Sequence, residues 1–160
     1  MIYKLSVKKS RINGVISLPA SKSISNRMLI IQALCPVDFK IRNISTSDDT
    51  KVLIDALKNI DKETFDIGAA GTSMRFLSAY FSLISGKRIL TGSARMKQRP
   101  IDELVSILQL FGAEIQYLEQ EKFPPIKIEG KKLMASPVTI RGDISSQFIT
   151  ALLLIAPSLD

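Results

Sequence analysis

The sequence contains no histidine and no tryptophan, and it has a single cysteine among its 160 residues. Without histidine the chain lacks the commonest general base and the commonest metal ligand, so any proton transfer must fall to Lys, Asp, Glu, Tyr or water. Aromatic residues make up only 6% of the chain and do not alternate with basic residues, as they do in proteins that bind single-stranded nucleic acid. Small anionic ligands therefore rank above nucleic acid.

Long apolar runs are also missing. Residues 1–5 hold no apolar core of signal-peptide length, and the longest apolar run, 151–157, is too short to span a bilayer. Cys35 cannot form a disulfide within the chain, and a lone cysteine at the end of an apolar helix is more often a small core residue than a nucleophile. We therefore expect a cytoplasmic protein in a reducing compartment, without membrane contact.

Basic residues outnumber acidic ones. The chain has 22 Lys and Arg against 15 Asp and Glu, a formal net charge of +7. This excess favours negatively charged partners, although it does not by itself distinguish nucleic acid, lipid and small anions. The length suits one domain or slightly more, because a compact domain of this size buries roughly 70% of its unfolded surface.

The segment 18–27 leads directly into an apolar run at 28–34. Its serines can cap a helix, so a helix of at least three turns is expected here. Lys22, Ser23 and Arg27 then crowd the first turn, beside backbone N–H groups that have no partner inside the helix. Cations, hydroxyls and the positive end of a helix together favour an anion. The alternative is an ordinary capped surface helix whose cations are solvated.

Hydrophobic periodicity predicts alternating strands and helices along the chain. The expected strands are a pair within residues 1–18 joined by Asn13-Gly14, followed by 39–44, 87–91, 113–118, 126–129 and 138–140. The expected helices are 50–57, a run after Gly71 that Gly86 stops, 101–111 and 148–155. Pro100 is expected at the first position of the helix at 101–111. Asp48 and Asp49 are expected to cap the helix at 50–57 rather than to bind metal, because no further ligand recurs at suitable spacing.

The loop at 92–100 holds three cations just before an expected helix: Arg95, Lys97 and Arg99. These cations are either a solvated surface or a clamp that closes on an anion. We favour the clamp, because the loop lies between a strand and a helix, as the other candidate segments do. The glycine-rich turn at 67–71 is a further candidate, although no Gly-Lys-Ser/Thr follows it at P-loop spacing.

Three expected helix starts, 24–29, 72–77 and 144–149, can be laid over one another. Each places a serine and, two residues later, a side chain rich in hydrogen-bond donors: Arg27, Arg75 and Gln147. The spacing indicates a repeated strand–helix unit, with chance similarity among serine-rich caps as the alternative. In such a repeat, several positive helix ends can face one cleft and bind an anion there.

Motifs spread over nearly all of the chain carry a family resemblance. They are Leu18-Pro19-Ala20-Ser21-Lys22-Ser23-Ile24-Ser25-Asn26-Arg27, Ser47-Asp48-Asp49-Thr50, Ala70-Gly71-Thr72-Ser73-Met74-Arg75, Arg95-Met96-Lys97-Gln98-Arg99-Pro100, Phe123-Pro124-Pro125 and Ser145-Ser146-Gln147. In this order they resemble the 5-enolpyruvylshikimate-3-phosphate synthase family. The resemblance implies an α/β (α+β) enolpyruvyl transferase-like lobe of repeated strand–helix units whose helix N-termini face a cleft, here truncated. Residues 19–160 would form the first lobe with about two of its three units, and residues 1–18 would pack with the missing second lobe.

The resemblance also implies a reaction and its site. The family transfers the enolpyruvyl group of phosphoenolpyruvate to shikimate 3-phosphate, in aromatic amino acid biosynthesis, with no metal or other cofactor. By position in the motifs, Ser23 and Arg27 are expected to bind the shikimate carboxylate, and Ser145 and Ser146 the phosphate of shikimate 3-phosphate. Gly71, through its N–H, and Arg99 are expected to bind the phosphate of phosphoenolpyruvate. Gln147 is expected at the junction of the two substrates, and Lys22 in contact with both substrates. The acid and base are expected in the missing part, so the chain alone should be inactive and the full-length protein a monomer.

Two alternatives stand beside this interpretation. The UDP-N-acetylglucosamine 1-carboxyvinyltransferase family shares the fold and the phosphoenolpyruvate chemistry, but it has Lys-Asn where this chain has Lys22-Ser23 and a reactive cysteine where the loop has Ser93 and Ala94. A basic nucleic-acid-binding module would instead show salt-dependent binding to any duplex.

The chain departs from many members of the family at three places. It has Ala69 where many have Asn, and Phe76 where many have Pro. It is also shorter between Leu57 and Gly68, which should cost it a hairpin.

Overall fold

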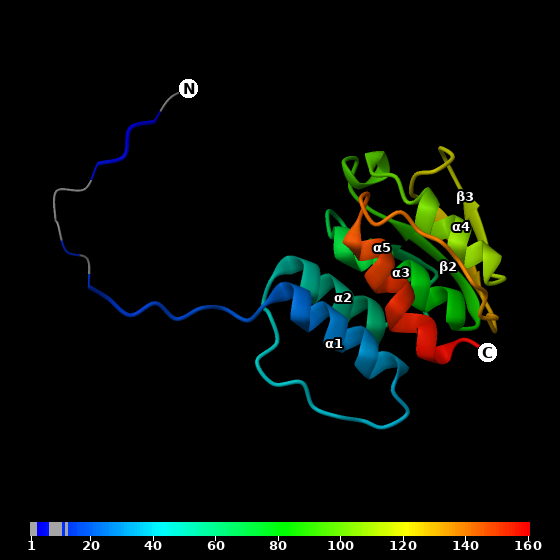
Figure 1. Cartoon of the computed structure of the whole chain (residues 1–160), viewed down its shortest axis with the longest axis horizontal. Helices are drawn as coiled ribbons and strands as arrows, with labels where there is room; N and C mark the ends of the chain where they lie inside the picture. Colours follow the sequence, from blue (N-terminus) through cyan, green and yellow to red (C-terminus); the bar gives the residue numbers. More distant parts are fainter. Residues whose placement is uncertain (1–2, 7–10, 12) are drawn as a thin grey trace.

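The computed structural model describes residues 3–6, 11 and 13–160, and predictions for 1–2, 7–10 and 12 fall outside these residues. Residues 3–6 and 13–18 contain no strand and are exposed, so the predicted strand pair is wrong for this part of the chain. Figure 1 shows residues 13–20 leaving the folded body with no strand alongside them. A strand needs a neighbouring strand for its backbone hydrogen bonds, and among the described residues the sheet does not extend to 13–18.

The sheet has four strands in the order β1-β2-β4-β3. They are β1 (Thr64–Asp66), β2 (Gly86–Thr91), β3 (Glu114–Tyr117) and β4 (Ile126–Gly130). β1 pairs with β2 in parallel, whereas β4 pairs antiparallel with both β2 and β3. The predictions at 87–91, 113–118 and 126–129 are therefore confirmed.

Five α-helices lie in the described residues: α1 (Lys22–Leu34), α2 (Asp48–Lys58), α3 (Gly71–Leu83), α4 (Asp102–Leu110) and α5 (Ser146–Ile155). Each of the predicted helices is confirmed, and short 3-10 turns lie at Met96–Gln98 and Ala156–Ser158. The prediction for Pro100 is wrong: Ile101 is the N-cap of α4, so Pro100 precedes the helix.

Two further strand predictions are wrong. Neither 39–44 nor 138–140 forms a strand, although both alternate in polarity. In each segment the alternating apolar residues, such as Ile41 and Val138, are half-buried against the core. Their side chains are packed, but no neighbouring strand pairs with their backbones.

α3 is the central element of the fold. Its residues from Gly71 to Ser82 are all buried, because it packs against β2 and β4 and also against α1, α2, α4 and α5. Where β4 meets the end of α3, Gly130 has no side chain, and a Cβ there would overlap the carbonyl oxygens of Phe81 and Ile84. The result is a mixed α/β fold, as expected, in which helices α1, α2 and α5 gather around one buried helix (Figure 1).

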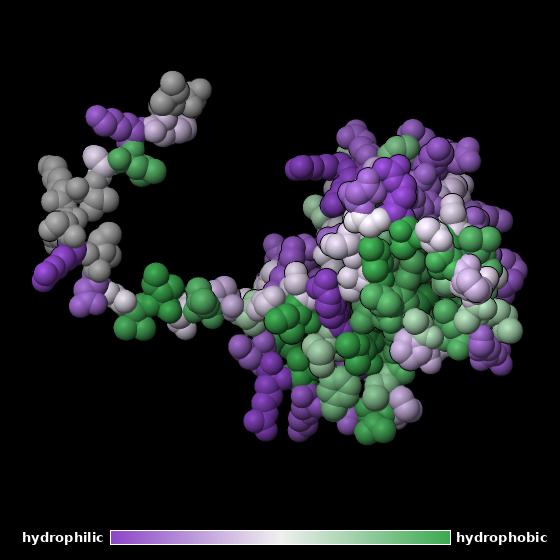
Figure 2. Space-filling view, viewed as in Figure 1, coloured by the Kyte–Doolittle hydropathy of each residue, from purple (hydrophilic) through white to green (hydrophobic). Residues whose placement is uncertain are grey.

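The surface over α1 and α5 is apolar. Figure 2 shows hydrophobic side chains gathered there, and Ile24, Ile31 and Leu153 are exposed large hydrophobic residues of these two helices. Cys35 caps the end of α1 and is exposed, so the expectation of a core cysteine is wrong. In the described part of the chain, none of the helices has the length and apolar character needed to cross a membrane.

We predict that Leu53→Ala lowers the free energy of unfolding by about 2–5 kcal/mol, because it leaves a cavity in the core around α3. Leu153→Ala is the matched control: it removes the same atoms from an exposed position and should change stability by less than about 1 kcal/mol. Urea denaturation of both variants measures the difference. Equal losses would contradict the assignment of Leu53 to the core.

Candidate functional site

The start of α1 presents three of the predicted residues. The Ser21 side chain caps the helix by accepting a hydrogen bond from the Ile24 N–H, which places Lys22 and Ser23 in the first turn. Arg27 lies one turn further on, not in the first turn as predicted. Its guanidinium nevertheless returns there, because it donates to the Ser23 carbonyl oxygen at 2.9 Å.

Direct contacts join the first turns of α1, α2 and α3. The Lys22 Nζ lies 2.9 Å from the Asp49 carboxylate in the first turn of α2. The Asp49 carbonyl oxygen accepts a hydrogen bond from the Ser73 hydroxyl in α3 at 3.1 Å. The predicted capping role of Asp48 and Asp49 is wrong: Ser47 is the N-cap of α2, and the two aspartates are its first two helical residues.

The start of α5 is fastened to two other helices. Ser145 is its N-cap and accepts from the Gln147 N–H, and Ser146 is its first helical residue. The Gln147 amide donates to the Thr72 hydroxyl in α3 at 3.2 Å. The Arg27 guanidinium of α1 donates to the Thr150 hydroxyl of α5 at 3.4 Å.

Arg99 lies against the start of α3. A Cβ on Gly71 would collide with the Arg99 guanidinium, so the absence of a side chain at Gly71 permits this approach. Gly71 is the first residue of α3, and its N–H therefore has no acceptor within the helix. An amide N–H and a guanidinium at one place can both donate to a single anion.

The three cations of the 92–100 loop do not act alike. Lys97 pairs with Glu119 at 2.6 Å, so its charge is already balanced. Arg99 lines a hollow of about 360 Å³ together with Arg75 and Ser145, and Arg95 and Arg99 line a second of about 420 Å³ with Ala69. Of the predicted clamp, only Arg95 and Arg99 line these hollows.

Arg75 is a functional candidate with no predicted role, although it belongs to the repeated helix starts and to the motif at 70–75. It is 4% exposed and has no carboxylate partner among the described residues. It donates to the carbonyl oxygens of Gly71 and Pro100, each at 3.2 Å, so it ties the start of α3 to the loop that carries Arg99. Burial, and to a lesser extent the neighbouring Arg99, lowers the pKa of Arg75 to about 10.

The charges of the helix starts divide the five helices into two groups. α2 and α4 carry two acidic residues each in the first turn, which balance the positive end of the helix dipole. α1, α3 and α5 carry none. Every predicted binding residue except Arg99 lies on one of these three helices or at its N-cap, so the unbalanced helix ends and the predicted binding groups coincide.

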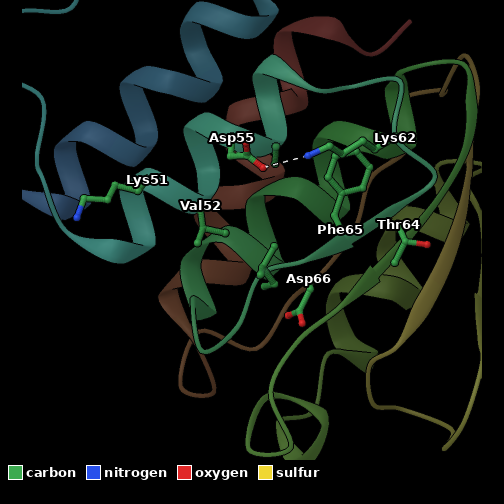
Figure 3. A pocket seen from close by; sticks show the side chains of 9 residues that line it. Lys51, Val52, Asp55, Lys62, Thr64, Phe65 and Asp66 are labelled. Carbon is green, nitrogen blue, oxygen red and sulfur yellow. Dashed lines mark hydrogen bonds and ion pairs between the residues drawn. The ribbon is translucent and has the colours of Figure 1, made fainter.

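A third hollow lies away from these helix starts. It measures about 400 Å³ and lies between α2 and β1, with Lys51, Asp55, Lys62 and Asp66 among its lining residues. Figure 3 shows Lys62 pointing toward Asp55, 3.5 Å away, while Lys51 points elsewhere. None of the predicted binding residues lines this hollow. In the described residues, no three His, Cys, Asp or Glu side chains are grouped so that they could hold a metal ion.

A sequence profile described as EPSP synthase (3-phosphoshikimate 1-carboxyvinyltransferase) matches residues 7–67 and 60–160 of the chain. The chain belongs to the EPSP synthase family. Its EPSP synthase relatives include the 3-phosphoshikimate 1-carboxyvinyltransferase of Bacteroides fragilis (strain YCH46), 52% identical over 159 residues, which are 99% of this chain and 38% of the relative. The enzyme of the same name from Colwellia psychrerythraea is 43% identical over 175 aligned positions, covering 94% of this chain and 41% of the relative.

A solved EPSP synthase has the same fold. The structure from Acinetobacter baumannii matches with a TM-score of 0.82 at 22% sequence identity, covering 92% of this chain and 38% of that one. The chain thus spans about 40% of the length of the curated relatives that it matches. The two stretches matched by the EPSP synthase profile overlap at 60–67, where the chain is expected to be shorter than many members and where the hollow of Figure 3 lies.

We predict that Arg75→Lys lowers the free energy of unfolding by about 1–3 kcal/mol, because one ammonium cannot reach both carbonyl oxygens that the guanidinium holds. Arg95→Lys, an exposed change in the neighbouring loop, should alter stability by less than about 0.5 kcal/mol. Urea denaturation compares the two variants. If they behave alike, Arg75 does not tie α3 to the loop.

Proposed function

We propose that this chain supplies a substrate-binding lobe for transfer of the enolpyruvyl group from phosphoenolpyruvate to shikimate 3-phosphate. A hydroxyl of shikimate 3-phosphate forms the new C–O bond, and inorganic phosphate leaves. The observation that carries the proposal is the meeting of the α1, α3 and α5 starts, with Lys22, Arg27, Arg99 and Gln147 around them.

Electrostatics is the physical reason for such a site. Both substrates are multiply charged anions, and they must come within bonding distance of each other before any reaction. Their repulsion has to be offset by positive groups that are already in place. Three helix ends without acidic residues, together with the guanidinium and ammonium groups beside them, supply positive groups of this kind.

Each predicted residue has a role in this proposal. On α1, Ser23 and Arg27 bind the shikimate carboxylate, and Lys22 reaches both substrates. At the start of α5, Ser145 and Ser146 bind the phosphate of shikimate 3-phosphate, and Gln147 lies between the substrates. The Gly71 N–H and Arg99 bind the phosphate of phosphoenolpyruvate.

The proton-transfer groups are expected in the part of the relatives that lies beyond the match. The apolar face over α1 and α5 supports the presence of such a further part, because an exposed apolar patch of this kind is typical of an interface. We also infer a cytoplasmic, monomeric enzyme with small anions rather than nucleic acid as its ligands.

A chimera tests the function. Residues 1–160 replace the matched region of the Bacteroides fragilis relative, and release of inorganic phosphate is measured with both substrates present. We expect turnover by the chimera and none by the 160-residue chain alone. A folded chimera that does not turn over, beside an active Bacteroides fragilis enzyme, would contradict the proposed function, and turnover by the chain alone would contradict the assignment of the acid and base to another part.

We predict that Arg27→Ala weakens binding of shikimate 3-phosphate to the chimera by at least about tenfold, because the substrate carboxylate loses its cationic partner. Arg42→Ala removes the same charge from an exposed position outside the helices and strands and should leave the affinity unchanged within about twofold. Isothermal titration calorimetry measures both. Equal affinities for Arg27→Ala and the unsubstituted chimera would remove Arg27 from the site.

A further inference from the structure

The two acidic residues that begin α2 differ in their surroundings. The Asp48 side chain is 97% exposed and lies 3.4 Å from Lys51 of its own helix. The Asp49 side chain is 23% exposed and lies 2.9 Å from the Nζ of Lys22 in α1. Both can balance the helix dipole, but only Asp49 contacts a residue of the proposed substrate site.

We propose that Asp49 is a positioning residue that holds the Lys22 ammonium at the common start of α1 and α3. The inference rests on the proposed function, because it takes Lys22 as the group that reaches both substrates. A carboxylate cannot itself attract the anionic substrates, and placed beside them it works against their binding. A carboxylate at this position is therefore explained by what it does to Lys22.

Asp49 is held rigidly enough for this role. Its carbonyl oxygen accepts from the Ser73 hydroxyl at 3.1 Å, which fixes its backbone against α3. The next residue, Thr50, donates to the Asn26 side chain in α1 at 2.8 Å, and both of these side chains are fully buried. The backbone around Asp49 is thus held to α3 through Ser73 and to α1 through Asn26.

The conformational freedom of the Lys22 side chain explains why a partner would improve substrate binding. Its side chain is 46% exposed on a flexible four-carbon stem, and fixing a side chain of this kind costs conformational entropy. An ammonium has three donors, so a contact with Asp49 leaves two for substrate oxygens. If Asp49 fixes the side chain beforehand, less of this entropy is lost when the substrates bind.

Asp49→Asn and Asp48→Asn form a matched pair of variants. Each keeps the size of the side chain and one acceptor oxygen while removing one negative charge from the first turn of α2. In the chimera, we expect Asp49→Asn to lower kcat/KM for phosphoenolpyruvate by about five- to tenfold and Asp48→Asn to change it by less than about twofold. The melting temperatures of the two variants should agree, because both lose the same interaction with the helix dipole.

A double-mutant cycle separates positioning from other roles. Binding of shikimate 3-phosphate alone is measured by calorimetry for the chimera, Asp49→Asn, Lys22→Ala and the double variant. If Asp49 acts through Lys22, Asp49→Asn should weaken substrate binding by less than about twofold when Lys22 is already replaced by Ala. Additive effects, equal kinetics for the Asp48 and Asp49 variants, or tighter binding by Asp49→Asn would overturn the inference.

A readout on the 160-residue chain is independent of activity. NMR relaxation of the Lys22 side chain, with 13C in the ε position, should show greater mobility in Asp49→Asn but not in Asp48→Asn. An inactive unsubstituted chimera would contradict the proposed function and leave this measurement to decide the positioning role. Unchanged mobility in Asp49→Asn would contradict the positioning role even in an active enzyme.

Discussion

The arrangement depends on one electrostatic constraint: several helices begin at the same end of the fold. Each helix start carries about half a positive charge, so neighbouring starts repel one another. Contacts between side chains and backbone of different helices oppose this repulsion, among them Lys22 with Asp49 and Gln147 with Thr72. Because α1, α3 and α5 lack acidic residues in their first turns, the remaining positive potential favours an anion from outside the chain.

Arg75 places a buried positive charge near the start of α3. A buried cation without a carboxylate is unfavourable, and its lowered pKa reflects that burial. Its guanidinium is nevertheless held by the carbonyl oxygens of Gly71 and Pro100, and it lies over the Phe148 ring at 5.6 Å. An anion bound at Arg99 would offset the repulsion between the two guanidinium groups. Such an anion would therefore couple stability to ligand binding at this position.

The sequence predicts the helices well because their signals are local. A serine cap, acidic residues in the first turn and an apolar periodicity all lie within a few residues of each helix that they mark. Strands depend on partners elsewhere in the chain, and the alternating segments 39–44 and 138–140 have none in the described part. The site residues likewise divide into those marked by local signals and those placed by contacts between distant parts of the chain. The helix starts were predictable, whereas the contact between Lys22 and Asp49, 27 residues apart, was not.

The short connection from α2 to β1 is held to the end of α3 by one side chain. Arg88 in β2 donates to the Ile60 carbonyl oxygen at 3.0 Å and to the Ile84 carbonyl oxygen at 2.8 Å, so one buried guanidinium fastens the connection to the end of α3. These contacts of Arg88 lie at the C-terminal ends of α2 and α3. Asp49 and Gly71 lie at the opposite, N-terminal ends of the same helices. The 11 residues of α2 and the 13 residues of α3 therefore separate this connection from the helix starts by roughly 15–20 Å.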